Sequence, residues 1–372
     1  MDRADVVVIG AGVMGSATAR TLAGRGVETI LLEQFAVGHT RGSSHGPTRI
    51  FRLSYPVADY TRLAQRALRA WRALEDAAAE GLLVTTGGLD VGPTALDCRG
   101  SLEQAGLPYE WLSPREAGER FPTINFEGLS EVLYQPDAGV CRADRAVTAQ
   151  VRLARANGAD VRDETEVQHL EVAGDHVRVR TPAGEIEARV AVVTAGSWAS
   201  SLLTGAGFPP LPLAPILQHV SYFGGATEIP TFIDWTGPKL SWYALPPAGE
   251  AAGVKVGAHV GGATVDPSHG PFKVEPDRAD LHTNYVRMRF PGLDSQPLHT
   301  ETCLYTMTPD EDFLIDRSGP VVIGSPCSGH GFKFGPLIGE LLADLATGRE
   351  PDMPRDRFAI DRPRLRDPGW RP

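Results

Sequence analysis

Cysteine is scarce in this chain, and so are the long apolar runs that a membrane protein needs. The four cysteines, Cys98, Cys141, Cys303 and Cys327, lie far apart, without the Cys-x-x-Cys spacing of a metal site. No apolar run approaches the ~18 residues of a membrane-spanning helix. No charged and apolar leader precedes the strand that begins at Asp5. We therefore predict a cytoplasmic, reduced protein with no metal and no membrane segment.

Positive charge is also limited. The formal net charge is −10, and no block of like charge interrupts the sequence. Proteins that bind nucleic acid present a basic patch to the phosphate backbone, so no nucleic-acid partner is expected. The length of 372 residues exceeds the ~250 to ~300 residues at which a single core stops growing. We expect two domains.

What the chain does contain is a glycine-rich turn at its start. Residues 5–9 are typical of a buried strand, and residues 13–24 of a helix. Between them, Gly10, Gly12 and Gly15 form the spacing Gly-x-Gly-x-x-Gly. The first glycine permits a tight turn, the second lets the backbone approach a pyrophosphate, and the third lets the helix pack against the strand. Phosphates then meet free N–H groups at the helix N-terminus, which predicts a dinucleotide site.

A carboxylate in the expected place strengthens this prediction. A second strand over residues 29–33 ends in Glu33, 18 residues after Gly15. In dinucleotide-binding folds, an acid ~20 residues beyond the glycines binds the ribose hydroxyls. At this end of the chain we predict cofactor contacts from Gly10, Gly12, Val13, Met14, Gly15, Glu33 and Gln34.

The rest of the chain alternates between helical and extended patterns. Residues 38–54 form a loop rich in Gly, Ser, His and Arg, and a loop of this kind inside a nucleotide domain is commonly functional. Helices are predicted at residues 59–79, 142–156, 277–290 and 332–345, and a further helix is predicted to start at the capping box Ser113–Glu116. Strands are predicted at residues 82–92, 167–172, 176–181, 185–189, 190–196, 218–223, 240–245, 254–259, 303–307 and 321–324. The pattern predicts an α/β fold, with a discontinuous Rossmann-type domain and a second α+β domain built on an antiparallel sheet.

Three separated stretches resemble one family. They are residues 42–52, 303–316 and 328–334, with 253–259 lying between the first two. On these motifs the chain resembles the monomeric sarcosine oxidase and N-methyltryptophan oxidase family, FAD-dependent amine oxidases of the D-amino acid oxidase superfamily. The resemblance implies an FAD-binding domain of residues 1–85, 142–212 and 317–372, and a substrate domain of residues 86–141 and 213–316.

The resemblance also implies that FAD is attached covalently, through a thioether between the flavin 8α carbon and Cys303. A cysteine is nucleophilic only as its thiolate, so a basic environment is expected around it. Without the resemblance, a lone cysteine is read as a small buried hydrophobic residue. Cys327 is a rival attachment point. Further cofactor contacts are implied for Ser43, Ser44, Thr48, Arg49, Ala195, Gly196, Trp198, Gly329, His330, Gly331, Phe332 and Lys333.

The family's reaction removes a hydride equivalent from the carbon next to an amine nitrogen and delivers it to flavin N5. Dioxygen then reoxidises the flavin, and the products are an imine and hydrogen peroxide. We therefore expect an amine or amino acid substrate, dioxygen as the acceptor and a monomer. The alternatives are a flavin-dependent amine or imino acid dehydrogenase with another acceptor, a pyridine-nucleotide enzyme, and a flavin-holding protein with a silenced site.

Two cations are implied to fix the carboxylate of the substrate. Arg52 offers a planar two-pronged donor and Lys333 adds a point charge. The alternative for both is a solvated surface charge. Lys255 is implied to stabilise superoxide during oxygen activation, although its place in an alternating strand would by itself predict a lysine that points to solvent.

The remaining implied contacts surround the flavin and the substrate. His45, Thr48 and Arg49 are expected to line a flavin face, and His259 and Tyr243 to face the substrate. His330 and the backbone around Gly329 and Gly331 are expected to donate N–H groups to the flavin O2 carbonyl.

The chain departs from the sarcosine enzymes at Ile233-Asp234-Trp235 and at Trp242. An extra acid and two bulky indoles near the mouth of the site disfavour sarcosine. We predict a substrate that is larger, or one with a second polar or cationic group that Asp234 binds beside Trp242.

Overall fold

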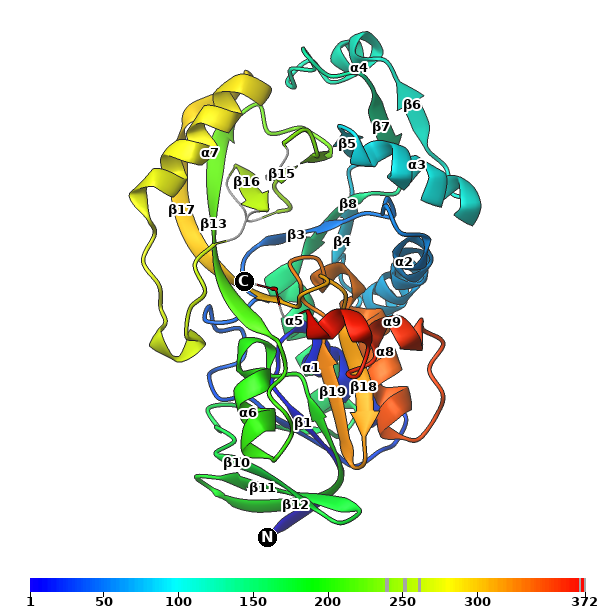
Figure 1. Cartoon of the computed structure of the whole chain (residues 1–372), viewed down its shortest axis with the longest axis vertical. Helices are drawn as coiled ribbons and strands as arrows, with labels where there is room; N and C mark the ends of the chain where they lie inside the picture. Colours follow the sequence, from blue (N-terminus) through cyan, green and yellow to red (C-terminus); the bar gives the residue numbers. More distant parts are fainter. Residues whose placement is uncertain (238–240, 250–252, 260–261, 368, 371–372) are drawn as a thin grey trace.

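A computed structural model describes the chain except residues 238–240, 250–252, 260–261, 368 and 371–372. Leu240, the predicted start of one strand, lies outside the described residues. In Figure 1 one large sheet occupies the lower half of the molecule and a second one the upper half. Among the helices that the structure describes, none has the length and apolar character needed to cross a membrane.

The first sheet has a parallel centre. Strand β1 (Asp2–Ile9) pairs in parallel with β2 (Thr29–Leu32) and with β12 (Gly184–Val193). The sheet order is β10-β11-β12-β1-β2-β9, and β19 joins β12 to β18. The outer strands are β9 (Asp160–Arg162), β10 (His169–Ala173), β11 (His176–Thr181), β18 (Leu314–Ser318) and β19 (Val321–Ser325).

Strand β12 corrects one prediction. Residues 185–189 and 190–196 were expected as two strands, one in a meander and one in the nucleotide domain. Residues 184–193 form one strand that pairs antiparallel with β11 and, further along, parallel with β19, and residues 194–196 lie beyond its end. No turn residue separates the two halves, so the chain passes directly from one pairing to the other.

Helices pack against this sheet. Helix α1 (Val13–Gly24) contacts α5 (Ala143–Ala156) and α8 (Gly335–Ala346). A Cβ atom on Gly339 would lie 2.4 Å from the Cβ of Ala17, so glycine permits the close approach of α8 to α1. Helix α2 (Ala58–Ala78) contacts α8, α6 (Ala199–Gly205) contacts β10, and α9 (Arg355–Phe358) contacts β18, whereas α3 (Thr94–Ala105) and α4 (Pro114–Arg120) contact strands of the second sheet. The capping box before α4 is confirmed, since Ser113 and Glu116 each accept from the other's backbone N–H.

The second sheet has the order β17-β13-β16-β15-β14-β5-β7-β6. Its strands are β5 (Gly88–Val91), β6 (Glu110–Leu112), β7 (Val132–Gln135), β13 (Ala214–Gly225), β14 (Thr231–Asp234), β15 (Ser241–Leu245), β16 (Val254–His259) and β17 (Leu293–Met307). The predicted antiparallel sheet is confirmed except at one place, where β14 and β5 run parallel.

One face of the second sheet packs against helix α7 (Pro276–Arg289). Val254 and Val256 of β16 belong to the same apolar cluster as Tyr285 and Val286 of α7. Successive side chains of a strand point to opposite faces. Lys255 therefore points to the other face of the sheet.

A small third sheet joins β3 (Thr48–Phe51), β8 (Gly139–Arg142) and β4 (Leu83–Thr85). Strand β3 lies inside the segment 38–54 that was predicted to be loop throughout. Pairing with β8, about 90 residues further along the chain, forms this strand, and the local sequence does not reveal it.

We propose the division into two domains that the sequence implied. The first large sheet draws its strands from residues 2–32, 160–193 and 314–325, and the second from residues 88–135 and 214–307. The chain thus crosses repeatedly between the two sheets.

Candidate active site

A cavity of about 840 Å³ extends from the glycine-rich turn to the second sheet. This volume lies within the ~300 to ~1,000 Å³ typical of ligand sites. Most of the predicted site residues line it: Gly10, Gly12, Val13, Met14, Glu33, Gln34, Ser43, Ser44, His45, Arg49, Arg52, Ala195, Gly196, Trp198, Trp242, Tyr243, Lys255, His259, Cys303, Gly329, His330, Gly331, Phe332 and Lys333. Three predicted residues, Gly15, Thr48 and Asp234, are not part of its lining.

The glycine-rich turn is packed too tightly for side chains. Gly10 has a φ of +97°, and a Cβ atom there would lie 2.7 Å from the carbonyl oxygen of Thr194. On Gly15 a Cβ atom would lie 1.8 Å from the carbonyl oxygen of Gly10. Gly15 thus lies between helix and turn, away from the cavity. Gly12 begins α1 without a side-chain cap, and Val13 N donates to Ser44 Oγ at 3.1 Å.

Glu33 follows β2 and lines the cavity with only 5% of its surface exposed. Its carboxylate accepts from Ala11 N at 2.8 Å and from Phe35 N at 3.0 Å. His39 Nε2 lies 3.4 Å from Glu33 Oε1. These contacts hold the carboxylate beside the glycine-rich turn.

Arg49 organises the loop that follows β2. Its guanidinium donates to the carbonyl oxygens of Ser43, His45 and Thr48, at 3.0, 2.6 and 2.9 Å. The imidazole of His45 lies within hydrogen-bond distance of Gly42 O and Thr302 O, at 2.8 and 3.2 Å. The Arg49 guanidinium therefore holds the backbone of this loop together, and Arg49 also lines the cavity.

Thr48 does not reach the cavity, against the prediction. It is 1% exposed, and its hydroxyl has no hydrogen-bond partner in the described structure. Strand β3 begins here, and backbone pairing with Arg142 fixes the residue away from the cavity lining.

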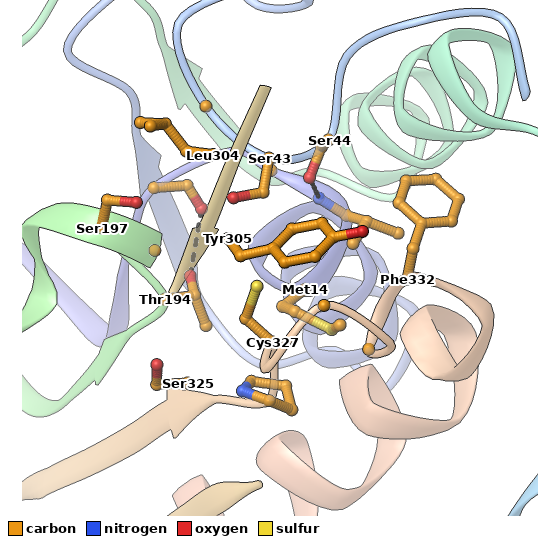
Figure 2. A pocket seen from close by; sticks show the side chains of 18 of the residues that line it. Met14, Ser43, Ser44, Thr194, Ser197, Leu304, Tyr305, Ser325, Cys327 and Phe332 are labelled. Atoms are coloured by element: carbon orange, nitrogen blue, oxygen red, sulfur yellow. Dashed lines mark hydrogen bonds between the residues drawn. The ribbon is translucent and has the colours of Figure 1, made fainter. Parts of the chain in front are cut away.

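Cys303 lies on β17 beside two cations. Burial raises the pKa of its thiol, and the charges of Arg49 and Lys255 oppose this shift. The basic environment expected around this cysteine is therefore present. Figure 2 shows a second thiol, Cys327, directed into the cavity with Met14 and Tyr305.

Lys255 lies on the cavity face of the second sheet and is 3% exposed. Burial, and next the charge of Arg49, lower the pKa of its ammonium group to about 7, while Cys303 and Glu301 act in the opposite direction. The Nζ atom lies 5.6 Å from the centre of the Tyr222 ring. This lysine does not point to solvent.

Arg52 and Lys333 meet at Tyr55. Both cations are buried, with 6% and 2% of their surfaces exposed, and both line the cavity. The guanidinium carbon of Arg52 lies 4.2 Å from the centre of the Tyr55 ring. Lys333 Nζ donates to Tyr55 Oη at 2.9 Å and to His330 O at 2.5 Å. Burial, and next the charge of Arg52, hold the pKa of Lys333 well below its usual value. Arg52 and Lys333 are therefore not solvated surface charges.

The donors of His330 are already engaged within the protein. Its backbone N–H donates to Cys327 O at 2.9 Å. Its ring nitrogens lie 3.3 Å from Tyr55 Oη and 3.1 Å from Glu311 O. The sequence predicts that His330 and the backbone around Gly329 and Gly331 donate to the flavin, and the backbone part of this stays a prediction. The structure instead connects Lys333, Tyr55 and His330 in one chain of contacts that orients the lysine.

His259 and Tyr243 lie on adjacent strands of the cavity face. Burial, and next the charges of Arg52 and Lys333, lower the pKa of His259 to about 4. Tyr243 forms a side-chain hydrogen bond with Tyr305, and burial raises its pKa. At neutral pH both groups are therefore uncharged.

Asp234 does not face the cavity, so the prediction that it binds substrate is wrong. It is 0% exposed, and its carboxylate accepts from Tyr285 Oη at 2.9 Å and from Thr236 N at 2.9 Å. Arg289 Nε lies 3.4 Å away. Asp234 and Phe232 point to the α7 face of β14, whereas Ile233 and Trp235 line the cavity.

Trp242 shares the α7 face with Asp234, its partner in the β14–β15 register. It contributes to the cavity wall, but its indole stacks on the Tyr285 ring at 4.1 Å with an interplanar angle of 3°. The indole ring is therefore part of the packing under α7 as well as of the cavity wall, and its contact with substrate stays a prediction.

Several lining residues were missed. Tyr55 follows the predicted loop directly, and Tyr305 lies two residues after Cys303, on the same face of the strand. A spacing of two residues could have identified Tyr305 from Cys303. Trp235 was noted only as a departure from the family.

A family model described as FAD dependent oxidoreductase matches residues 5–345. The chain is 32% identical over 380 residues to the monomeric sarcosine oxidase of Bacillus sp. (strain B-0618), with 98% of this chain and 97% of that protein covered. It is 30% identical to the N-methyl-L-tryptophan oxidase of Salmonella heidelberg (strain SL476), with 96% and 98% covered.

Among solved structures, the fold is similar to that of NikD, an unusual amino acid oxidase essential for nikkomycin biosynthesis. The TM-score is 0.86, the sequence identity is 27%, and 96% of this chain and 98% of that chain are covered.

Proposed function

The chain belongs to the FAD-dependent oxidoreductase family, and from this we propose that it is an oxidase of a secondary amine or an amino acid. The observation that carries the proposal is the pair of buried cations, Arg52 and Lys333, on the same cavity as the glycine-rich turn. Asp90 lies 3.7 Å from Arg52 Nη1 and balances part of the charge of Arg52, whereas the ion pairs of the described residues include none for Lys333. A buried ammonium group without a partner charge is costly. The carboxylate of an amino acid substrate would supply that partner.

The residues present fit FAD. The glycines admit a pyrophosphate at the open N-terminus of α1, and Glu33 is buried at the position of a ribose-binding acid. FAD, when bound, supplies the acceptor for a hydride equivalent and passes electrons to dioxygen. The protein's own contribution is to bind and orient the substrate and to position charged side chains along the cavity.

We propose that FAD is attached covalently at Cys303. Arg49 and Lys255 support this, because both favour the thiolate form of Cys303, the form in which a cysteine is nucleophilic. Cys303→Ser is expected to lose attachment while Cys327→Ser keeps it. The measurement is flavin fluorescence of the protein band on a denaturing gel after acid treatment. Flavin retained by Cys303→Ser and lost from Cys327→Ser would move the attachment to Cys327.

We propose that Arg52 and Lys333 hold the substrate carboxylate while His259 and Tyr243 face its amine. An uncharged imidazole and an uncharged phenol do not repel a cationic amine as it enters. Orientation then places the carbon next to nitrogen toward the cofactor.

Lys255 supports dioxygen as the acceptor, since a buried ammonium group stabilises a developing superoxide anion. Oxygen consumption and hydrogen peroxide formation with N-methylated amino acids test this. Substrate reduction of the flavin without oxygen uptake would favour the dehydrogenase with another acceptor.

The reaction with dioxygen is expected to slow as pH rises. Lys255 is cationic below its pKa of about 7 and neutral above it, so its stabilising charge is lost as pH rises through that value. Negative charge on a reduced cofactor would move this midpoint upward. The measurement is the reoxidation rate of reduced enzyme between pH 6 and 10, with an expected midpoint at or above about 7. A rate that increases with pH would contradict this role.

We further propose a monomer that works in the cytoplasm. The four cysteines are all free in the structure, as the reducing cytoplasm would keep them. Light scattering after size exclusion measures the oligomeric state.

A further inference from the structure

Trp235 and Arg52 are both anchored to one buried carboxylate, Asp90, which the proposed reaction has not used. Asp90 lies on β5 and is 2% exposed. Its neighbours Leu89 and Val91 pack in the apolar cluster of the second sheet. Because the side chains of a strand alternate, Asp90 points to the opposite face, toward Arg52.

Both oxygens of Asp90 are engaged. Trp235 Nε1 donates to Oδ1 at 3.0 Å, and Ser54 Oγ donates to Oδ2 at 2.6 Å. Arg52 Nη1 lies 3.7 Å from Oδ1. One carboxylate oxygen thus serves the indole and the guanidinium together.

The indole is fixed from two sides. The backbone N–H of Trp235 donates to Val91 O at 2.8 Å, and the ring N–H donates to Asp90. The guanidinium carbon of Arg52 lies 5.4 Å from the centre of the indole. Trp235 is only half-buried and lines the cavity, so part of it remains open to a ligand beside Arg52.

We infer that Asp90 is a positioning residue that joins Arg52 and Trp235 into one recognition unit, and that this unit selects an amino acid bearing a planar apolar group. The inference rests on the proposed function, because Arg52 must hold the substrate carboxylate. The side chain of the substrate, attached next to that carboxylate, then reaches Trp235. Contact with the indole ring makes a flat apolar side chain bind more tightly than a methyl group or a hydrogen atom.

Binding of unreactive carboxylates to the FAD-loaded protein tests this, with the visible spectrum of the flavin as the readout. Acetate carries the carboxylate alone, and phenylacetate adds a planar apolar group. Wild-type protein is expected to bind phenylacetate about tenfold more tightly than acetate. Trp235→Ala should reduce this preference to about twofold or less, with acetate affinity changed by no more than about twofold.

Two changes at Asp90 separate positioning from general stability. Asp90→Asn keeps an acceptor oxygen for the indole N–H and should keep the preference. Asp90→Val removes the acceptor oxygen, so this variant should lose the preference for phenylacetate. It should also bind acetate more weakly, because Arg52 loses its anchor. A residue that only stabilises the fold would lower the unfolding midpoint in both variants without changing the ratio of the two affinities.

Equal affinities for acetate and phenylacetate in wild type overturn the inference, as does a preference that survives Trp235→Ala. Either result leaves the carboxylate site intact, provided that Arg52→Met weakens both ligands. If neither carboxylate binds and N-methylated amino acids do not reduce the flavin, the proposed function fails together with the inference.

Discussion

Lys255→Met is expected to slow the reaction of the reduced enzyme with dioxygen by about 10²- to 10³-fold, the usual loss when a preorganised electrostatic group is removed. Methionine has a similar length and no charge, so the packing of β16 is largely kept. Reduction by substrate under anaerobic conditions should change much less, because Arg52 and Lys333 still bind the carboxylate. Stopped-flow absorbance measures both half-reactions separately.

Lys273→Met is the matched control. Lys273 is exposed, and the same substitution there should leave both half-reactions unchanged. The pH dependence provides a second check, since the reoxidation rate of Lys255→Met should no longer fall as pH rises. A reoxidation rate within a few-fold of wild type would show that another group activates dioxygen.

Asp234→Ala is expected to lower the free energy of unfolding by about 3 to 5 kcal/mol, the cost of removing one partner of a buried ion pair. The variant would leave Arg289 buried at 5% exposure without its carboxylate, and would remove the acceptor for Tyr285 Oη. Denaturant unfolding followed by tryptophan fluorescence measures the change.

Asp280→Ala is the control on helix α7, where the same substitution removes an exposed carboxylate and should change stability little. Replacing Asp234 and Arg289 together, by Ala and Met, should recover part of the loss because no buried charge remains unpaired. Unchanged stability in Asp234→Ala, combined with an altered ranking of amine substrates, would restore the earlier prediction that Asp234 binds substrate.

Local structure was predicted well where contiguous residues decide it. Helix α1 and the capping box of α4 occur where the sequence placed them, since backbone sterics and short-range hydrogen bonds fix both. Strand β3 was missed inside the loop of residues 38–54 because its partner β8 is distant in sequence. The three carbonyl contacts of Arg49 that close the same loop could not be predicted either, because they depend on the path of the backbone.

Lys255 and Asp234 show most clearly what the sequence alone could not predict. Both lie in strands whose side chains alternate, and the sequence specifies that alternation. It does not specify which face meets helix α7 and which meets the cavity. For Lys255 the pattern favoured solvent, whereas for Asp234 the nearby indoles favoured the active site.

The sequence by itself determined the glycine-rich turn, the acid at Glu33, most of the element order and the family, because each depends on residues in a fixed local spacing. Only the tertiary structure decided that Lys255 faces the cavity, that Asp234 faces α7, and that Asp90 links Arg52 to Trp235. The physical reason is that a strand presents two chemically different faces, and the packing of α7 from a distant part of the chain determines which of them is covered and which lines the cavity.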